Sequence, residues 1–152
     1  MRYWEDFQVG DSVEVGPVTI TEDEIVEFAR KYDPQPFHVD AAAAAASPFG
    51  GLIASGWQTT ALFMGMFVRG VLLDSASLGS PGVEEIRGLA PVRPGDTLTG
   101  RSTITDVQPS SSGAPRGTVF TTNEFVNQDG TVVLRMKARG LFATRSAPNA
   151  HP

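Results

Sequence analysis

Two ionisable side chains stand five residues apart in a segment that we interpret as a loop made stiff by two prolines. Asp33 and His38 are the ends of the run Asp-Pro-Gln-Pro-Phe-His, and each proline holds its own φ at about −65°. A histidine with an ordinary pKa of ~6.5 changes charge near neutral pH, and a carboxylate beside it can orient it or share a water molecule with it. Asp33 and His38 are therefore the candidate acid-base pair. The plainer interpretation is that His38 is structural or solvated and that Asp33 only ends a helix.

Few other residues could act together with His38. The chain has two histidines and no cysteine, and the second histidine, His151, is the next-to-last residue. We interpret Asp40 as the N-cap of a helix over the alanines 41–46, although the His-x-Asp spacing also suits a metal site. A facial triad of two histidines and one carboxylate would need His151, so we expect no metal. The lack of cysteine removes disulfides and thiolate nucleophiles, and it suits a reducing compartment such as the cytoplasm.

A glycine-rich turn supplies a third chemical group. Residues 50–56 read Gly-Gly-Leu-Ile-Ala-Ser-Gly and lead into a long apolar segment. Such a turn is by default a tight connection. Backbone N–H groups in the first turn of a helix are also free donors in a positive potential, so the Gly56 N–H is a candidate oxyanion-hole donor. The sequence has no G-x-S-x-G elbow, P-loop or dinucleotide-binding glycine pattern, which gives no support to a serine hydrolase or a nucleotide-binding protein.

A predicted amphipathic helix places Asp33. Thr21 and Glu24 have the spacing of a capping box. The apolar side chains that follow at helical spacing are Ile25, Phe28, Ala29 and Tyr32. Because Pro34 disfavours helical dihedrals at the residue before it, the helix is expected to end at about Tyr32, with Asp33 at its exit.

A second capping box, Ser55 with Gln58, predicts the start of a long helix from Gly56 to about Leu73. Apolar residues cover nearly every face of it, so we expect it to be buried all round at the centre of the domain. Polar residues interrupt it, Arg69 among them, which favours a core helix over a membrane span. Its large side chains either line a substrate tunnel or, as we favour, fill the core: they are Trp57, Phe63, Met64 and Met66.

Strand patterns occupy most of the remaining chain. A valine-rich segment over residues 11–20 precedes the first helix, and four more follow the central helix, over residues 83–92, 97–107, 118–127 and 131–144. Apolar and basic residues alternate in the last strand, as in a sheet with one buried side. One long apolar helix and several antiparallel strands predict an α+β fold, a single domain over residues 1–144 whose sheet curls around the helix. We expect residues 145–152 to be a disordered tail.

The composition limits the partners. The chain has 152 residues, of which 41% are hydrophobic, enough for one core without the composition of a membrane protein. It has 12 basic and 17 acidic residues, a net charge of −5, and no basic run that could neutralise a row of phosphates. We therefore expect no nucleic-acid partner and no membrane span. Residues 1–10 lack the apolar core of a signal peptide, which also favours a cytoplasmic protein.

Three motifs occur in order along the chain. The first is F-A-x3-D-x-Q-P-x-H-x-D over residues 28–40, the second is FGGLIASGW over residues 49–57, and the third is PVRPGDTL over residues 91–98. Together they resemble the MaoC-like family, which contains the (R)-specific enoyl-CoA hydratases. The similarity runs from about Tyr3 to Phe142. It implies a hot dog fold, usually a homodimer, with each active site beside the subunit interface.

The resemblance also implies roles for individual residues. Asp33 and His38 would hold and activate a water molecule that adds reversibly to a trans-2-enoyl-CoA and gives a (3R)-3-hydroxyacyl-CoA, with Gly56 as the oxyanion-hole donor. Coenzyme A is part of the substrate, and no separate cofactor is implied. The predicted substrate-binding residues are Gln35, Ser55, Trp57 and Arg93. Further arginine candidates for the phosphates of CoA are Arg87, Arg101 and Arg135.

Two other functions are weighed against hydration. Hot dog folds also include thioesterases and carrier-protein dehydratases, which typically carry a carboxylate on the central helix, whereas residues 56–73 contain no Asp or Glu. A non-catalytic acyl-thioester-binding protein is the other alternative. Its best support is Gln35, since family members commonly have asparagine there, and many have histidine in place of Ser55. Neither difference removes an acid-base group, and a pure binding protein has no need of Asp33 and His38 together.

Overall fold

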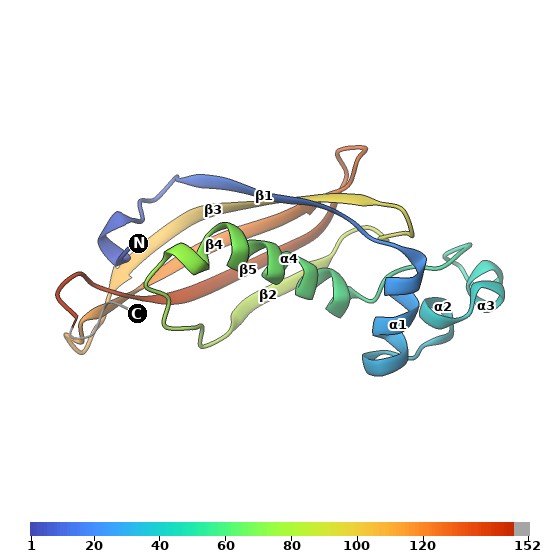
Figure 1. Ribbon diagram of the computed structural model, residues 1–152, viewed down its shortest axis with the longest axis horizontal. Helices are drawn as coiled ribbons and strands as arrows, with labels where there is room; N and C mark the ends of the chain where they lie inside the picture. Colours follow the sequence, from blue (N-terminus) through green and yellow to red (C-terminus); the bar gives the residue numbers. More distant parts are fainter. Residues whose placement is uncertain (148–152) are drawn as a thin grey trace.

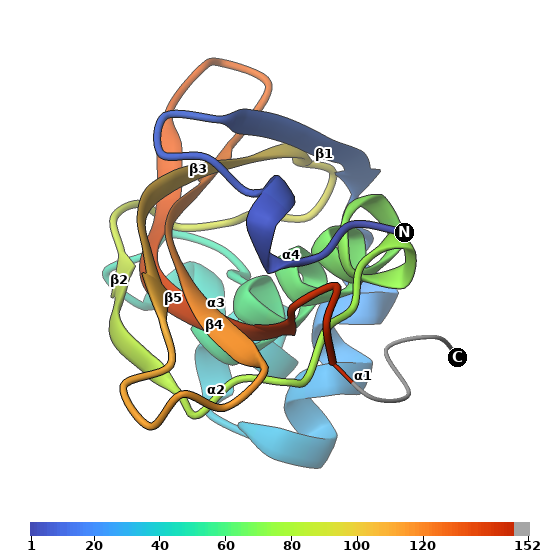
Figure 2. The ribbon, with the colours of Figure 1, turned by 90° about the vertical axis from the view of Figure 1, so that its left-hand side faces the viewer.

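A five-stranded antiparallel sheet curls around one long helix in the computed structural model, which describes residues 1–147 (Figure 1). The strands are β1 (Ser12–Thr19), β2 (Val83–Gly88), β3 (Thr97–Pro109), β4 (Arg116–Val126) and β5 (Val132–Ala143), in the order β1-β3-β4-β5-β2. The helix, α4 (Gly56–Gly70), lies along the concave face of the sheet (Figure 2). This arrangement confirms the predicted α+β hot dog fold.

Three short helices gather beyond the N-terminal end of α4, at one end of the sheet (Figure 1). They are α1 (Glu22–Tyr32), α2 (Pro36–Val39) and α3 (Ala41–Ala46), while the 3-10 helices η1 (Trp4–Asp6) and η2 (Leu72–Asp74) lie toward the other end. Thr21 caps α1, since its hydroxyl accepts a hydrogen bond from the Glu24 N–H at 3.2 Å. Asp40 caps α3 by accepting from the N–H groups of Ala42 and Ala43 at 3.0 and 3.1 Å. Both predicted caps and the predicted exit of α1 at Asp33 are confirmed.

Three local predictions need correction. The segment from Asp33 to His38 is not all loop, because Pro36 begins the one-turn helix α2, a position where proline loses no helical hydrogen bond. The second capping box forms only in part. Ser55 caps α4, but the Gln58 amide donates to the Glu24 carbonyl oxygen at 3.1 Å. The strand expected over residues 83–92 ends at Gly88.

The core fills the space between α4 and the sheet. Phe63 of α4 is 1% exposed, and its ring meets that of Phe125 on β4 edge-on, with centroids 5.3 Å apart. Gly100 on β3 permits this close approach, because a Cβ there would lie 2.7 Å from the Val15 side chain and 2.9 Å from Phe63. Burial of a phenylalanine contributes about 1.5–3 kcal/mol, so this contact is a main support of the fold.

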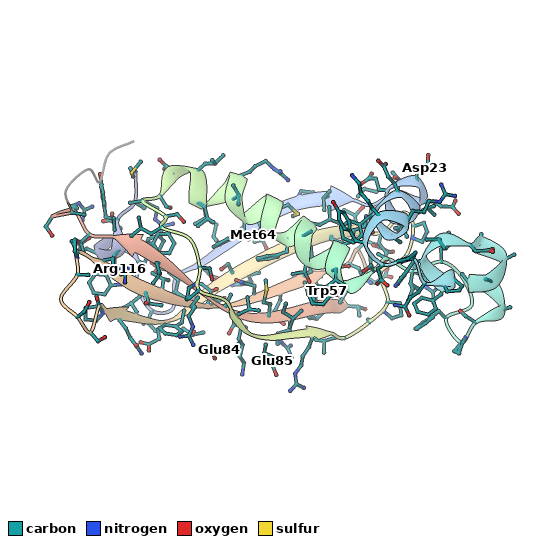
Figure 3. All side chains as sticks on the ribbon, turned by 90° about the horizontal axis from the view of Figure 1, so that it is seen from below. Asp23, Trp57, Met64, Glu84, Glu85 and Arg116 are labelled. Carbon is teal, nitrogen blue, oxygen red and sulfur yellow. The ribbon has the colours of Figure 1, made fainter. Side chains whose placement is uncertain are left out.

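The prediction that α4 is buried on every face is wrong for the single chain. Trp57 is 67% exposed and Met64, seven positions further on, is 47% exposed (Figure 3). Residues this far apart fall on the same side of a helix. An apolar stripe of α4 is therefore open to a partner or to solvent.

The first residues of the predicted C-terminal tail, 145–147, are described and make contacts. Arg145 donates to the Asp6 carboxylate at 2.7 Å and lies over the Tyr3 ring at 5.4 Å. Residues 148–152, and His151 with them, lie outside the described residues. Among residues 1–147, no helix is both long and apolar enough to cross a membrane.

Candidate active site

The predicted acid-base pair meets at the N-terminal end of α4. Asp33 follows the last residue of α1 and His38 lies on α2. The Nε2 atom of His38 lies 3.3 Å from the Oδ2 atom of Asp33. The His38 residue is 4% exposed, and the Asp33 side chain keeps 18% of its surface open. The pair is thus largely enclosed, with one accessible side.

One backbone contact fixes the protonation pattern of His38. Its Nδ1 atom lies 2.6 Å from the carbonyl oxygen of Ile53. A carbonyl oxygen only accepts hydrogen bonds, so Nδ1 carries a proton and donates it to this bond. Nε2 faces the Asp33 carboxylate and is the ring nitrogen on the side of the acid-base pair. No side-chain pattern points to Ile53, because every residue has a carbonyl group.

Asp33 is held by three neighbours. Its Oδ1 atom accepts from the Gln35 amide at 2.8 Å, and its Oδ2 atom accepts from the Ser55 hydroxyl at 2.8 Å. The Gln35 hydrogen bond lowers the pKa of the Asp33 carboxyl most, and Ser55 and His38 lower it further against the opposing effect of burial. Asp33 is consequently ionised at neutral pH.

Ser55 joins the acid-base pair to α4. Its side chain is fully buried, and its hydroxyl oxygen accepts from the Trp57 N–H at 3.3 Å while the hydroxyl donates to Asp33. Ser55 is thus both the N-cap of α4 and a hydrogen-bond donor to the acid. One hydroxyl links the position of the carboxylate to the start of the central helix.

Gly56 presents an unused donor beside this pair. It is exposed, it is the first residue of α4, and its N–H has no acceptor among residues 1–147. A Cβ at this position would have no atom within 4 Å. The positive end of the helix dipole adds to the attraction of this N–H for a developing negative charge. Both features suit an oxyanion hole.

The other predicted substrate-binding residues differ in their surroundings. Trp57 is exposed next to Gly56. Arg93 is exposed, and its guanidinium donates to the carbonyl oxygen of Phe49. Two of the remaining arginine candidates are paired with acids, Arg87 with Glu85 and Arg135 with Glu124, and Arg101 donates to the Ser12 hydroxyl. Of these four, Arg93 lies in contact with the turn that leads to Gly56.

A cavity of about 670 Å³ lies between α4 and the sheet. Phe63 and Met64 line it, whereas Met66 is 5% exposed and belongs to the core. Met64 thus lines the cavity, Met66 packs in the core, and Phe63 does both. No cluster of three or more histidine, aspartate or glutamate side chains that could hold a metal ion is found within residues 1–147.

Several known proteins are similar to this chain in sequence and in fold. The family model of the MaoC like domain matches residues 6–124. The 3-hydroxyacyl-thioester dehydratase Z of Mycobacterium tuberculosis is 36% identical over 109 residues, which cover 70% of this chain and 72% of that protein. The crystal structure of a MaoC-like dehydratase from Rhodospirillum rubrum has a TM-score of 0.88 and 38% identity, and covers 95% of this chain and 99% of that one. R-hydratase PhaJ1 from Pseudomonas aeruginosa has a TM-score of 0.72 and 27% identity, with 93% and 85% covered. The chain thus belongs to the MaoC-like domain family and is a hydro-lyase of the hydratase and dehydratase type.

Proposed function

We propose that the protein catalyses the reversible hydration of a trans-2-enoyl-CoA to a (3R)-3-hydroxyacyl-CoA. The observation that carries the proposal is the position of the His38 Nε2 atom, 3.3 Å from the Asp33 carboxylate, near a helix N-terminus with a free Gly56 N–H. Water addition to a conjugated thioester needs one group that moves a proton and one that stabilises negative charge on the thioester oxygen. The site offers both.

His38 is the proton carrier in this scheme. Its neutral Nε2 takes a proton from a water molecule as the water oxygen forms its bond to C3. The same proton then passes from Nε2 to C2, so the elements of water add to one face of the double bond. Asp33 is the weaker base because its pKa is lowered, and its negative charge instead stabilises the imidazolium that forms in between.

Gly56 stabilises the enolate. As water attacks C3, the electrons of the double bond move toward the thioester oxygen. The Gly56 N–H, at the positive end of α4, donates a hydrogen bond to that oxygen when its charge is largest. When C2 accepts its proton, the electrons return and the carbonyl group forms again.

Gln35 and Ser55 position the acid in this proposal. Each of them donates a hydrogen bond to the Asp33 carboxylate, and the Ser55 side chain is buried. That Gln35 and Ser55 also contact the substrate stays a prediction. Trp57 and Arg93 also stay proposed substrate contacts, because both are exposed near the turn that precedes α4. A guanidinium suits the phosphates of CoA.

The reaction as proposed needs no cofactor besides the CoA of the substrate, since each step is a proton transfer or a hydrogen bond. The acyl chain occupies the cavity under α4, whose walls are mostly apolar. We also place the protein in the cytoplasm, in keeping with its lack of cysteine.

We further propose a homodimer that pairs the edges of β2. This strand bonds only to β5 among residues 1–147, and all of it except Glu85 is exposed. Exposed apolar side chains lie on or beside it: Val83 at 48%, Ile86 at 37% and Leu89 at 44%. An open apolar edge strand pairs readily with another strand. Light scattering after size exclusion should give a dimer for wild type and for Val9→Lys, which changes an exposed residue outside β2, and a monomer for Ile86→Lys. A wild-type monomer would contradict this assembly.

The hydration proposal is tested by following the conjugated enoyl-thioester absorbance with crotonyl-CoA. Wild type should consume it, and Asp33→Asn and His38→Ala should each lower kcat/KM by about two to four orders of magnitude. Circular dichroism of each variant should match wild type. A wild type that binds CoA esters without turnover would make the protein a thioester-binding protein, and full activity in both variants would remove the pair from the mechanism.

A further inference from the structure

The floor of the cavity under α4 carries a polar patch. Ser102 on β3 lies directly opposite Asn123 on β4, and Thr121 is two residues from Asn123 on the same strand face. All three line the cavity. The concave face of a sheet packed against a helix is normally apolar, so three polar residues in its centre call for an explanation.

Of the three, Asn123 has a buried polar atom without a hydrogen-bond partner in the described part of the chain. It is 3% exposed, and its Oδ1 atom has no hydrogen-bond partner among residues 1–147. A buried amide oxygen without a partner destabilises a fold, and the large majority of such atoms in native proteins are bonded. A leucine of similar volume would remove this cost. A hydrogen-bond donor from outside the described residues would satisfy this oxygen.

The rest of the cavity lining indicates which kind of molecule could bring a hydrogen-bond donor to Asn123. Its lining is mostly apolar and includes Phe63, Phe67, Val71 and Leu72 from α4 and the residues after it. Arg2, Asp11 and Arg139 also line it. A flexible apolar chain fits such walls, and one polar group on that chain would meet Asn123. A hydroxyl suits a carboxamide best, because it can donate to Oδ1 and accept from Nδ2.

The position of the cavity sets how far along the chain that group lies. Along α4 its wall begins at Phe63, which is seven residues from Gly56, or about 10 Å along the helix axis. A thioester bound at Gly56 reaches this wall only with a long acyl chain. A short acyl group such as crotonyl ends well before it.

We propose that the acyl chain of the physiological substrate is long and carries a hydroxyl group in its distal half, and that Asn123, assisted by Ser102 and Thr121, binds this hydroxyl. The inference rests on the proposed hydratase function for the location of the thioester. It adds the class of acyl group and the residues that select it.

The test compares matched substrates on wild type and Asn123→Leu. The substrates are trans-2-hexadecenoyl-CoA and a series of its hydroxy derivatives, with the hydroxyl moved one carbon at a time along the distal half of the chain. Crotonyl-CoA is the internal standard, since it does not reach the cavity. Thr121→Val, an isosteric change on the same strand face, is a second variant that keeps the core volume.

Wild type should favour a hydroxyl at one position or two adjacent positions, with kcat/KM about tenfold or more above the parent chain. Asn123→Leu should reverse this order, so that the parent chain reacts at least as well as in wild type while the favoured hydroxy substrate falls at least tenfold. Thr121→Val should weaken the preference in the same direction. Crotonyl-CoA turnover should be alike in all three proteins.

A hydroxyl that lowers kcat/KM at every position, and equally in wild type and Asn123→Leu, would overturn the proposal and leave water as the partner of Asn123. Failure of the hydratase function is a separate result, seen as no turnover of crotonyl-CoA by wild type. In that case calorimetric binding of the same CoA esters decides: a preference for the hydroxy chain that Asn123→Leu loses supports the site, and equal binding overturns it.

Discussion

Replacing Gly56 by proline removes a single hydrogen-bond donor from the proposed oxyanion hole. Gly56 is the first residue of α4, where proline is tolerated because its missing N–H has no helical partner. Ser55 before it has φ −60° and ψ 138°, an extended conformation that a following proline favours. A Cβ at position 56 has no atom within 4 Å, so the chain has room for the new side chain.

The expected effects on stability and on catalysis have opposite signs. Since proline restricts the unfolded chain and no native hydrogen bond is lost, Gly56→Pro should leave the free energy of unfolding unchanged or raise it by about 0.4–1 kcal/mol. Loss of one oxyanion-hole donor costs about 2.7–4 kcal/mol in the transition state, so kcat should fall by about 10²–10³. Gly56→Ala, which keeps the N–H, should retain most of the activity.

Urea unfolding and crotonyl-CoA kinetics on the three proteins decide the matter. A stable Gly56→Pro variant with wild-type kcat would refute the assignment of the Gly56 N–H. An equal loss of activity in Gly56→Ala would show that position 56 needs space rather than a donor. A rise in KM alone, with kcat unchanged, would mean that the N–H binds the substrate and the transition state equally well.

Three further predictions concern stability. The pKa of Asp33 is lowered in the folded protein, so its ionised form stabilises the fold above the unfolded-state pKa of about 3.9, and this contribution is lost as pH falls through the lower folded value. Ser55→Ala should therefore lower the free energy of unfolding more at pH 7 than in acid. A loss that is independent of pH would contradict this. Asp40→Ala should lose about 1 kcal/mol in urea unfolding through its two capping bonds, with crotonyl-CoA turnover retained. Gly100→Ala should destabilise by about 1–3 kcal/mol because of its crowded Cβ position, whereas Gly88→Ala, with no atom within 4 Å of its Cβ, should not; equal melting temperatures would rule out the close approach.

Features set by neighbouring residues were predictable from the sequence. Thr21 and Asp40 act within three residues of themselves, and Pro34 restricts the residue before it, so both caps and the exit of α1 at Asp33 were found. Pro36 was interpreted as a loop residue, although the same fixed φ also begins a helix. The surrounding sequence does not decide between these two uses.

Features that depend on distant contacts were not predictable. The Gln58 side chain leaves the expected capping box for a carbonyl oxygen on α1, a group whose position only the packed helices determine. His38 is oriented by the backbone of Ile53, which no side-chain pattern marks. Asn123 has no unusual neighbours in the sequence, and the lack of a partner for its Oδ1 atom within residues 1–147 depends on the cavity between α4 and the sheet.

The contacts that fix the acid-base pair all come from one continuous stretch of chain. Gln35, Ile53 and Ser55 hold Asp33 and His38, and none of them belongs to the sheet. The strands, in contrast, supply the cavity floor. The residues proposed for proton transfer and the residues proposed to select the acyl chain thus lie in separate parts of the sequence. If both proposals hold, mutations in the strands would change which acyl chain is accepted without altering the residues that move the proton. The cavity floor would then be the place to start when engineering a new specificity.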